Sequence, residues 1–309
     1  MSEKFYNLCR MTQDKLKNHV AFELVKTHGG DVKIGDGFVF AQGKIPVLLV
    51  AHLDTVHESV PSSIVYNTGT QAISSPNGIG GDDRCGVYMI LEIVKKYNCS
   101  VLFCEDEEVG GIGADKFTMT KLASDLNFNY MIEFDRKGKN DAVFYDCDNP
   151  EFEAFITKEF FKTNWGTFSD ISILAPHFKC AAVNLSCGYY QAHTKDEYVV
   201  WPEMEKCIEE ACKILERTTE DDKFEYIEAV YANSFMRGFS SYTYNGEFYA
   251  DDMIPGYYLI QYTDEHGREN WFEADAVSTE EAVGMFCMYY PNLSFNHIVD
   301  IQCDNGVYR

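Results

Sequence analysis

Five short segments of the sequence carry the residue types that bind divalent metal ions. They are VLLVAHLD, GIGGDDRCG, VLFCEDEEVGG, YMIEFDRKG and GYYQAHTKDEYV, and their candidate residues are His52, Asp54, Asp82, Asp83, Glu107, Glu108, Asp135 and His193. Four of these segments begin with, or directly follow, an apolar run typical of a β-strand. Because open α/β sheets build their sites at strand ends, we expect these side chains to converge. Two histidines with several carboxylates favour zinc, manganese or cobalt.

The pair His52 and Asp54 follows a strand-like run and can act as a ligand with its support. Residues i and i+2 of a strand point to the same side, so the Asp54 carboxylate can hold the His52 imidazole and fix its tautomer. The plainer interpretation is a histidine at a strand end beside a solvated aspartate. The motif alone does not decide between the two.

Asp82 and Asp83 lie on a glycine-rich turn directly before a predicted helix. Glycine lets the backbone turn sharply and approach an ion closely. One carboxylate has two oxygens and can therefore bridge two cations. The structural alternative is an aspartate that caps a helix, with a partner in the first turn.

The run EDEEVGG places four consecutive acids directly after a buried strand. Their mutual repulsion is costly unless cations or solvent relieve it. Glu108 can then ligate a metal while its neighbour Glu107 acts as a general base, and Glu105 and Asp106 are expected to face solvent. A solvated acidic loop is the alternative.

Two further candidates complete the set. Asp135 ends the strand YMIEF, with Glu133 two residues earlier on the same side, and His193 follows a Gly-Tyr-Tyr turn. A lone histidine there would more often be structural. Taken together, the ligands fit two metals that share one carboxylate, with one further carboxylate and one histidine each. Two metals roughly 3.5–4 Å apart polarise a carbonyl and acidify a shared water, and an adjacent glutamate moves the proton.

Alternating strands and helices must position these residues. The pattern predicts an α/β fold with a mixed, largely parallel central sheet and helices on both faces. The expected helices cover residues 2–28, 84–97, 113–125 and 202–217, and the expected strands lie at 31–42 (as a hairpin), 45–50, 100–104, 130–134, 143–145 and 181–185.

A polar linker, TTEDD, divides the sequence into a catalytic domain at 1–218 and a small α+β unit at 219–309. In the second unit we expect a hairpin of residues 257–263 and 270–274, a helix at 278–289 and a last strand at 295–303. His266 and His297 in this unit are expected to be surface or satisfied histidines. The unit could cover the site, bind a partner or stabilise the fold.

Composition excludes several classes of partner. The net charge of -23 over 309 residues argues against nucleic acid and against anionic membrane surfaces. The 11 cysteines are odd in number, form no CxxC pair and lie partly in apolar runs, which predicts reduced thiols in a reducing compartment. No signal peptide or membrane-spanning run is visible, so a cytoplasmic protein is expected.

In combination the segments resemble the co-catalytic dinuclear zinc exopeptidase superfamily. Its members include peptidase T, carboxypeptidase G, the bacterial leucyl aminopeptidases and the glutamyl aminopeptidases. GDDRCG and EEVGGIGA resemble the glutamyl aminopeptidases, whereas NWGTFSDISIL and GYYQAHTKDEYV are similar to peptidase T. The resemblance covers roughly residues 30–217.

The resemblance implies two metal ions, with zinc expected and cobalt or manganese as alternatives. The first metal would take His52, Asp82 and Asp135, and the second would take Asp82, Glu108 and His193. Glu107 would be the general base, Asp54 would orient His52, and Asp83 would support the ligands. The similar loop near the substrate makes Trp165, Thr167 and Asp170 weaker substrate-side candidates.

The sequence departs from many of these relatives in one respect. Only 27 residues separate Asp54 from Asp82, and 57 separate Asp135 from His193. Neither gap holds the dimerisation or lid domain that many relatives insert. The resemblance is therefore to the compact aminopeptidases without such an insert.

The expected function is a metal-dependent aminopeptidase acting on short peptides, since an acidic site attracts a free amine. A carboxypeptidase or N-acyl amino acid deacylase is the alternative. It would need a basic pocket, for which Arg84 and Arg136 are the nearby candidates. A protein that binds metal or peptide without catalysis, and an oligomeric assembly, are both left open.

Overall fold

The computed structural model describes residues 2–229, 256–264, 267–276 and 297–304, with single positions at 282, 286, 290 and 293. It forms two compact units, one of Met1–Asn164 with Ser169–Glu228, the other of Trp165–Phe168 with Ala229–Arg309. The first unit holds all five segments that carry the candidate metal ligands. It continues ten residues past the expected boundary at 218, because Glu225 and Glu228 bridge to Cys180 and Cys147.

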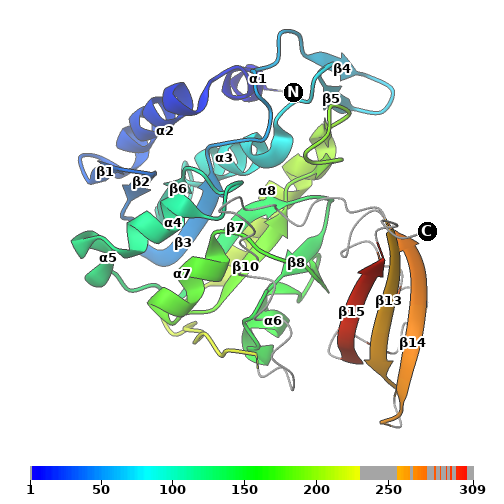
Figure 1. Cartoon of the computed structure of the whole chain (residues 1–309). Helices are drawn as coiled ribbons and strands as arrows, with labels where there is room; N and C mark the ends of the chain where they lie inside the picture. The colour runs from blue at the N-terminus through cyan, green and yellow to red at the C-terminus, as the bar shows by residue number, and fades with distance from the viewer. Residues whose placement is uncertain are drawn as a thin grey trace. The chain divides into compact units, whose positions relative to one another are not determined.

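The first unit is built on an eight-stranded mixed sheet (Figure 1). The central strands β6, β3, β7 and β10 run parallel, and antiparallel pairs attach β2 to β6 and β8 to β10. The order across the sheet is β1 (Val32–Gly35), β2 (Phe38–Ala41), β6 (Cys99–Cys104), β3 (Ile45–His52), β7 (Tyr130–Arg136), β10 (Ala182–Ser186), β8 (Asp141–Val143) and β9 (Lys162–Asn164).

Helices cover both faces of this sheet, as the sequence predicted. Along β3, Val47, Leu49 and Ala51 join one apolar core, and Leu48 and Val50 join the other. Such a strand is buried on both faces, which explains its continuous apolar run. The first core is shared with α1 (Glu3–Cys9), α2 (Gln13–His28), α3 (Gly81–Ile93), α6 (Pro150–Ile156) and α8 (Trp201–Arg217), and the second with α4 (Ile112–Thr118), α5 (Lys121–Ser124) and α7 (Ile171–Phe178).

A small antiparallel sheet of the first unit joins two loops of the site. Its order is β11 (Tyr189–Tyr190), β12 (Tyr198–Val200), β5 (Ala72–Ser74) and β4 (Val65–Asn67). His193 lies in the loop between β11 and β12, and β12 pairs with β5 of the segment that leads to Asp82. The sheet therefore holds two of the candidate ligand loops against each other.

The second unit contains a three-stranded antiparallel sheet in the order β14 (Glu269–Ala276), β13 (Gly256–Thr263) and β15 (Ile298–Asp304). These strands confirm the expected hairpin and last strand. Ala282 and Phe286 are helical and buried against Tyr258, Ile260 and Tyr262. Most of the helix expected at 278–289, and His266, lie outside the described residues.

The main differences from expectation are short elements. The expected helix at 2–28 is two helices, since α1 ends at Cys9 and α2 begins at Gln13, with Thr12 at its N-cap position in extended backbone. The expected helix at 113–125 is also two, divided before Lys121 by the cap of Thr120. The sequence did not indicate β4, β5, β9, β11, β12, α6 or α7. Strands of two or three residues show no period, and Pro176 inside α7 masks that helix.

Two findings bear on the environment of the chain. Nine cysteines of the first unit are free and buried. Within the described ranges, no helix is long and apolar enough to cross a membrane.

Candidate metal centre

Neighbouring parallel strands bring the first two candidate ligands together. His52 is the last residue of β3, Asp135 lies near the end of β7, and the two strands pair in parallel. Their carboxyl ends therefore meet at one edge of the sheet. Asp82 enters from the first turn of α3, where the backbone of Asp82 and Asp83 is not helical and their peptide bond is cis.

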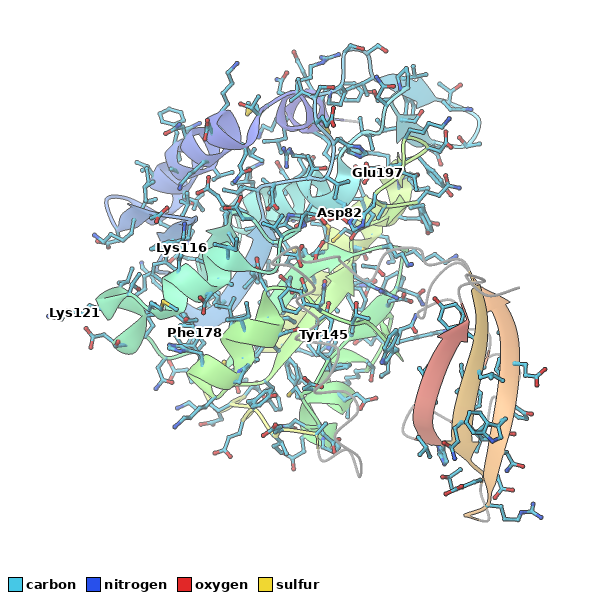
Figure 2. All side chains as sticks on the ribbon, in the orientation of Figure 1. Asp82, Lys116, Lys121, Tyr145, Phe178 and Glu197 are labelled. Carbon is cyan, nitrogen blue, oxygen red and sulfur yellow. The ribbon has the colours of Figure 1, made fainter. Side chains whose placement is uncertain are left out.

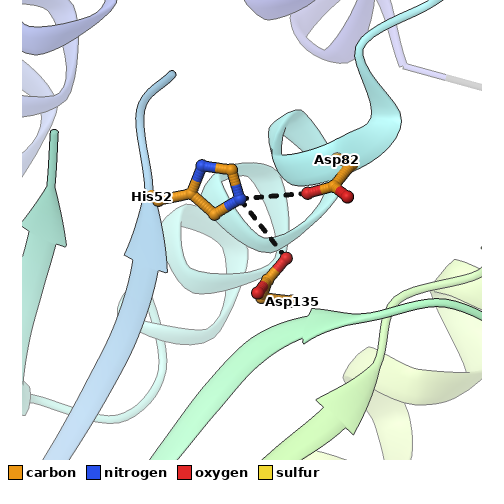
Figure 3. A group of neighbouring side chains, drawn as sticks. All are labelled: His52, Asp82 and Asp135. Atoms are coloured by element: carbon orange, nitrogen blue, oxygen red, sulfur yellow. Dashed lines mark hydrogen bonds and ion pairs between the residues drawn. The ribbon is translucent and has the colours of Figure 1, made fainter. Parts of the chain in front are cut away.

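His52, Asp82 and Asp135 form a first group (Figure 3). His52 Nε2 lies 3.0 Å from Asp82 Oδ1 and 3.3 Å from Asp135 Oδ1. The His52 side chain is fully buried, and the two carboxylates are each 9% exposed. One imidazole nitrogen and two carboxylate oxygens pointing at a common space are suitable donors for a zinc-like ion.

His193, Asp82 and Glu108 form a second group. His193 Nε2 lies 3.2 Å from Asp82 Oδ2 and 3.1 Å from Glu108 Oε2. Asp82 thus presents Oδ1 to the first group and Oδ2 to the second, which is the arrangement a bridging carboxylate requires. Glu108 Oε1 is buried without a hydrogen-bond partner among the described residues, so this donor set fits an additional cation.

Electrostatics at the centre favour a positive partner. Burial disfavours protonated His52, but Asp135 and its other carboxylate neighbours raise the His52 pKa well above its usual value. For Asp82, burial by itself would raise the pKa, but hydrogen bonds to His193 and His52 lower it. Burial, with the charge of Asp82, raises the pKa of Glu108 to about 7. Such a crowd of buried carboxylates is relieved by protons or by metal ions.

Asp54 connects His52 with the acidic loop. Its Oδ1 lies 3.2 Å from His52 Nδ1 and accepts a hydrogen bond of 3.1 Å from the Glu107 N–H. Its Oδ2 accepts a bond of 3.0 Å from the Glu108 N–H. The single carboxylate therefore sets the orientation of the imidazole and the position of both glutamates. Burial opposes ionisation of Asp54, but the hydrogen bond and charge of His52 and the bonds from the Glu108 and Glu107 N–H groups together outweigh it, and the pKa of Asp54 is lowered.

Glu107 is partly buried beside the two groups. Burial raises its pKa well above the ordinary glutamate value, against the opposing effect of His52. A buried glutamate whose pKa is raised in this way is suited to general acid–base work.

Three polar residues that sequence reasoning missed hold Asp135. Ser169 Oγ donates to Asp135 Oδ2 at 2.8 Å, and the Tyr189 hydroxyl donates to the Asp135 carbonyl oxygen at 3.0 Å. The side-chain amide of Asn184 exchanges hydrogen bonds with the Asp135 backbone. Ser169 and Tyr189 lie in the two segments that resemble peptidase T, and that position was the available signal.

Asp83 and both arginine candidates have structural partners. Asp83 is fully buried and accepts from the N–H groups of His52 and Gly86, so it supports the strand end. Arg84 is buried and donates to the carbonyl oxygens of Leu53 and Asp54. Arg136 forms an ion pair with Asp141.

The solvent-facing assignment of two acids was wrong for one of them. Glu105 is only 12% exposed and pairs with Lys17 of α2. Asp106 accepts a hydrogen bond from Gln13 and remains partly exposed. Helix α2 therefore covers this part of the acidic loop, an arrangement that no local pattern indicates.

The substrate-side candidates do not lie together in one unit. Asp170 is fully buried in the first unit, and burial raises its pKa to about 7. Glu133, two residues before Asp135, is also fully buried, and its Oε2 accepts from the Ile171 N–H. Trp165 and Thr167 belong to the second unit.

Comparison with solved structures identifies the fold. Aminopeptidase PepT from Bacillus cereus aligns with a TM-score of 0.55 at 14% identity, over 69% of this chain and 96% of its own. An aminopeptidase from the archaeon Desulfurococcus kamchatkensis gives 0.55 at 17% identity, over 71% and 95%. A tripeptidase from Staphylococcus aureus gives 0.54 at 14% identity, over 68% and 95%.

The chain shares the fold of these three proteins. The expected α/β fold class is thereby confirmed. No protein-family model and no curated protein matches the sequence. Within this fold, the two groups of candidate ligands lie at the carboxyl end of the central strands, where such sheets carry their sites.

Proposed function

We propose that the protein is a dinuclear-metal exopeptidase, an aminopeptidase that acts on short peptides. The observation that carries this proposal is Asp82, whose two carboxylate oxygens each lie beside one histidine of a separate ligand group. A carboxylate serving one ion, or capping a helix, has no need of a second histidine on its other oxygen.

The proposed centre holds two divalent ions, with zinc as the first candidate and cobalt or manganese as alternatives. His52 and Asp135 complete the ligands of one ion, Glu108 and His193 those of the other, and Asp82 is shared. When bound, such a pair polarises a carbonyl group and lowers the pKa of a water molecule.

Glu107 is proposed as the general base and acid. It accepts the proton of the attacking water and delivers it to the leaving amine as the peptide bond breaks. Its backbone is held by Asp54, which also holds His52. Asp54 therefore fixes the position of the proposed base, Glu107, relative to the proposed metal ligand His52.

The structure favours the amine end of a peptide over the carboxylate end. Arg84 and Arg136 were the nearby candidates for a basic pocket, but Arg84 is buried on backbone carbonyls and Arg136 pairs with Asp141. The acidic centre attracts a substrate ammonium group.

We assign catalysis to the first unit, without a lid or dimerisation insert, and assign no role to residues 229–309. Buried free thiols support a cytoplasmic location.

The test uses the full chain loaded in turn with zinc, cobalt or manganese and incubated with a mixed peptide library. Glu107→Gln serves as the matched control, because it removes the base and keeps the size of the side chain. Mass spectrometry should show stepwise loss of N-terminal residues by the parent only. Loss of C-terminal residues or of acyl groups would instead support the carboxypeptidase or deacylase alternative. No turnover with any metal would leave metal or peptide binding as the better account.

A further inference from the structure

Glu197 is a fully buried carboxylate that contacts the segment carrying the shared ligand. Its Oε1 accepts a hydrogen bond of 2.9 Å from the Asp82 N–H. Its Oε2 accepts a bond of 2.7 Å from the Gly80 N–H and lies 2.8 Å from His57 Nε2. Both oxygens are therefore used, and two of the three contacts are with backbone N–H groups of the turn that presents Asp82. Glu197 and Asp82 are labelled in Figure 2.

The same residue lies in the loop that carries His193. Glu197 follows His193 by four residues, and its N–H donates to the Thr194 carbonyl oxygen at 3.2 Å. The neighbouring Lys195 carbonyl oxygen accepts from the Gly78 N–H at 2.9 Å. Two connections thus join the His193 loop to the Gly78–Asp82 turn, so the two loops cannot shift independently.

The turn is closely fitted around Glu197 and His57. A Cβ atom on Gly81 would lie 3.3 Å from Glu197 Oε1 and 2.9 Å from a methyl carbon of Val199. A Cβ on Gly78 would lie 2.1 Å from the His57 ring, and the Gly78 φ of +85° already favours glycine. The backbone of this turn is consequently defined by the two side chains against which it lies.

We infer that Glu197 is a positioning residue for the two-metal centre, with His57 fixing its carboxylate. It holds the Asp82 backbone so that the two side-chain oxygens face separate histidines, and it couples this arrangement to the His193 loop. The inference rests on the proposed function. It adds two residues to the support of the centre: Glu197, which lies in the His193 segment but was not among the candidate residues, and His57, which lies outside the five segments.

Glu197→Gln is the informative variant because it keeps the size of the side chain. Only one amide atom can accept a hydrogen bond, so the amide nitrogen must face the N–H of either Gly80 or Asp82. Loss of a group that orients a metal ligand typically weakens metal binding by about 10- to 100-fold. The second ion, which depends on both Asp82 and His193, should lose affinity more than the first.

The measurement is a calorimetric titration of the metal-free full chain with Co²⁺, with thermal unfolding recorded for each metal-free variant. Glu210→Gln is the matched control, since Glu210 is also buried but pairs with Lys206 and Lys213 on α8. The control should bind both ions as the parent does. Glu197→Gln should bind the second ion about 10-fold or more weakly, with activity recovering as Co²⁺ is raised.

The outcomes separate this inference from the proposed function. A parent that binds fewer than two ions refutes both. A parent that binds two, with unchanged stepwise affinities in Glu197→Gln, refutes the inference alone, as does lower thermal stability without a change in affinity. If Glu197→Gln does not fold, His57→Ala tests the inference instead. His57→Ala must weaken binding of the second ion, and His57→Gln, which keeps an N–H donor, must restore the affinity for that ion.

Discussion

Asp54→Asn is expected to weaken binding of both ions. The carboxylate serves three donors, His52 Nδ1 and the Glu107 N–H at Oδ1 and the Glu108 N–H at Oδ2. An asparagine can keep its oxygen at the position with two donors, but its amide nitrogen then faces the Glu108 N–H. One hydrogen bond to a charged acceptor is lost, a cost of about 1.5–3 kcal/mol, and the other two weaken because the acceptor is neutral.

Converted at about 1.4 kcal/mol per tenfold, the single lost bond corresponds to roughly 10- to 150-fold in affinity. Part of this free energy is lost from the metal-free protein as well. We therefore expect the affinity for metal to fall by about 10- to 100-fold, which is the usual effect of removing a group that hydrogen-bonds to a metal ligand.

The assay is competition for Zn²⁺ against a chelator of known affinity. Asp106→Asn is the control, because it removes one charge from the same acidic loop while Asp106 contacts Gln13 rather than a ligand. The control separates loss of charge from loss of orientation. Equal affinities of the two variants, within about twofold, would refute the role given to Asp54.

Three further predictions follow from the site. Glu107→Gln should lower kcat by roughly 10²- to 10⁴-fold with metal content unchanged; steady-state peptide hydrolysis with elemental analysis checks this, and loss of metal would contradict it. The metal-free protein should lose stability as pH rises from 5 toward 8. Glu108 and Asp170 have folded pKa values of about 7, against ordinary values of 4.5 and 3.8, so the folded state holds their protons more tightly. Their stabilisation is full below about pH 4 and is lost by about pH 7. Thermal unfolding at several pH values checks this, and a chelated sample that is as stable at pH 8 as at pH 5 would contradict it. Arg136→Ala should change KM for a short peptide by less than about twofold, since Arg136 pairs with Asp141; a much larger rise would favour recognition of a substrate carboxylate.

Sequence reasoning located the ligand groups because strand ends in parallel sheets meet at one edge. His52 and Asp135 follow apolar runs that had to be buried strands, and the structure brings their side chains to within 3.3 Å. Their convergence needed no knowledge of loop conformations. Their role as metal ligands stays a prediction.

The partners of these residues were beyond sequence reasoning, because tertiary contacts decide them. In the local sequence, Glu197 is one acid in a polar run, and only the tertiary fold buries it against the Asp82 turn. Glu105 was expected in solvent, but α2 places Lys17 beside it. Arg84 was a candidate for contact with a substrate carboxylate, but its guanidinium donates to the backbone carbonyl oxygens of Leu53 and Asp54.

The most direct test of the two-metal centre is anomalous diffraction from crystals of the parent protein grown with zinc. The account predicts two peaks roughly 3.5–4 Å apart, one beside His52 and Asp135, the other beside Glu108 and His193, with Asp82 touching both. A single peak, or zinc bound away from Asp82, would contradict it.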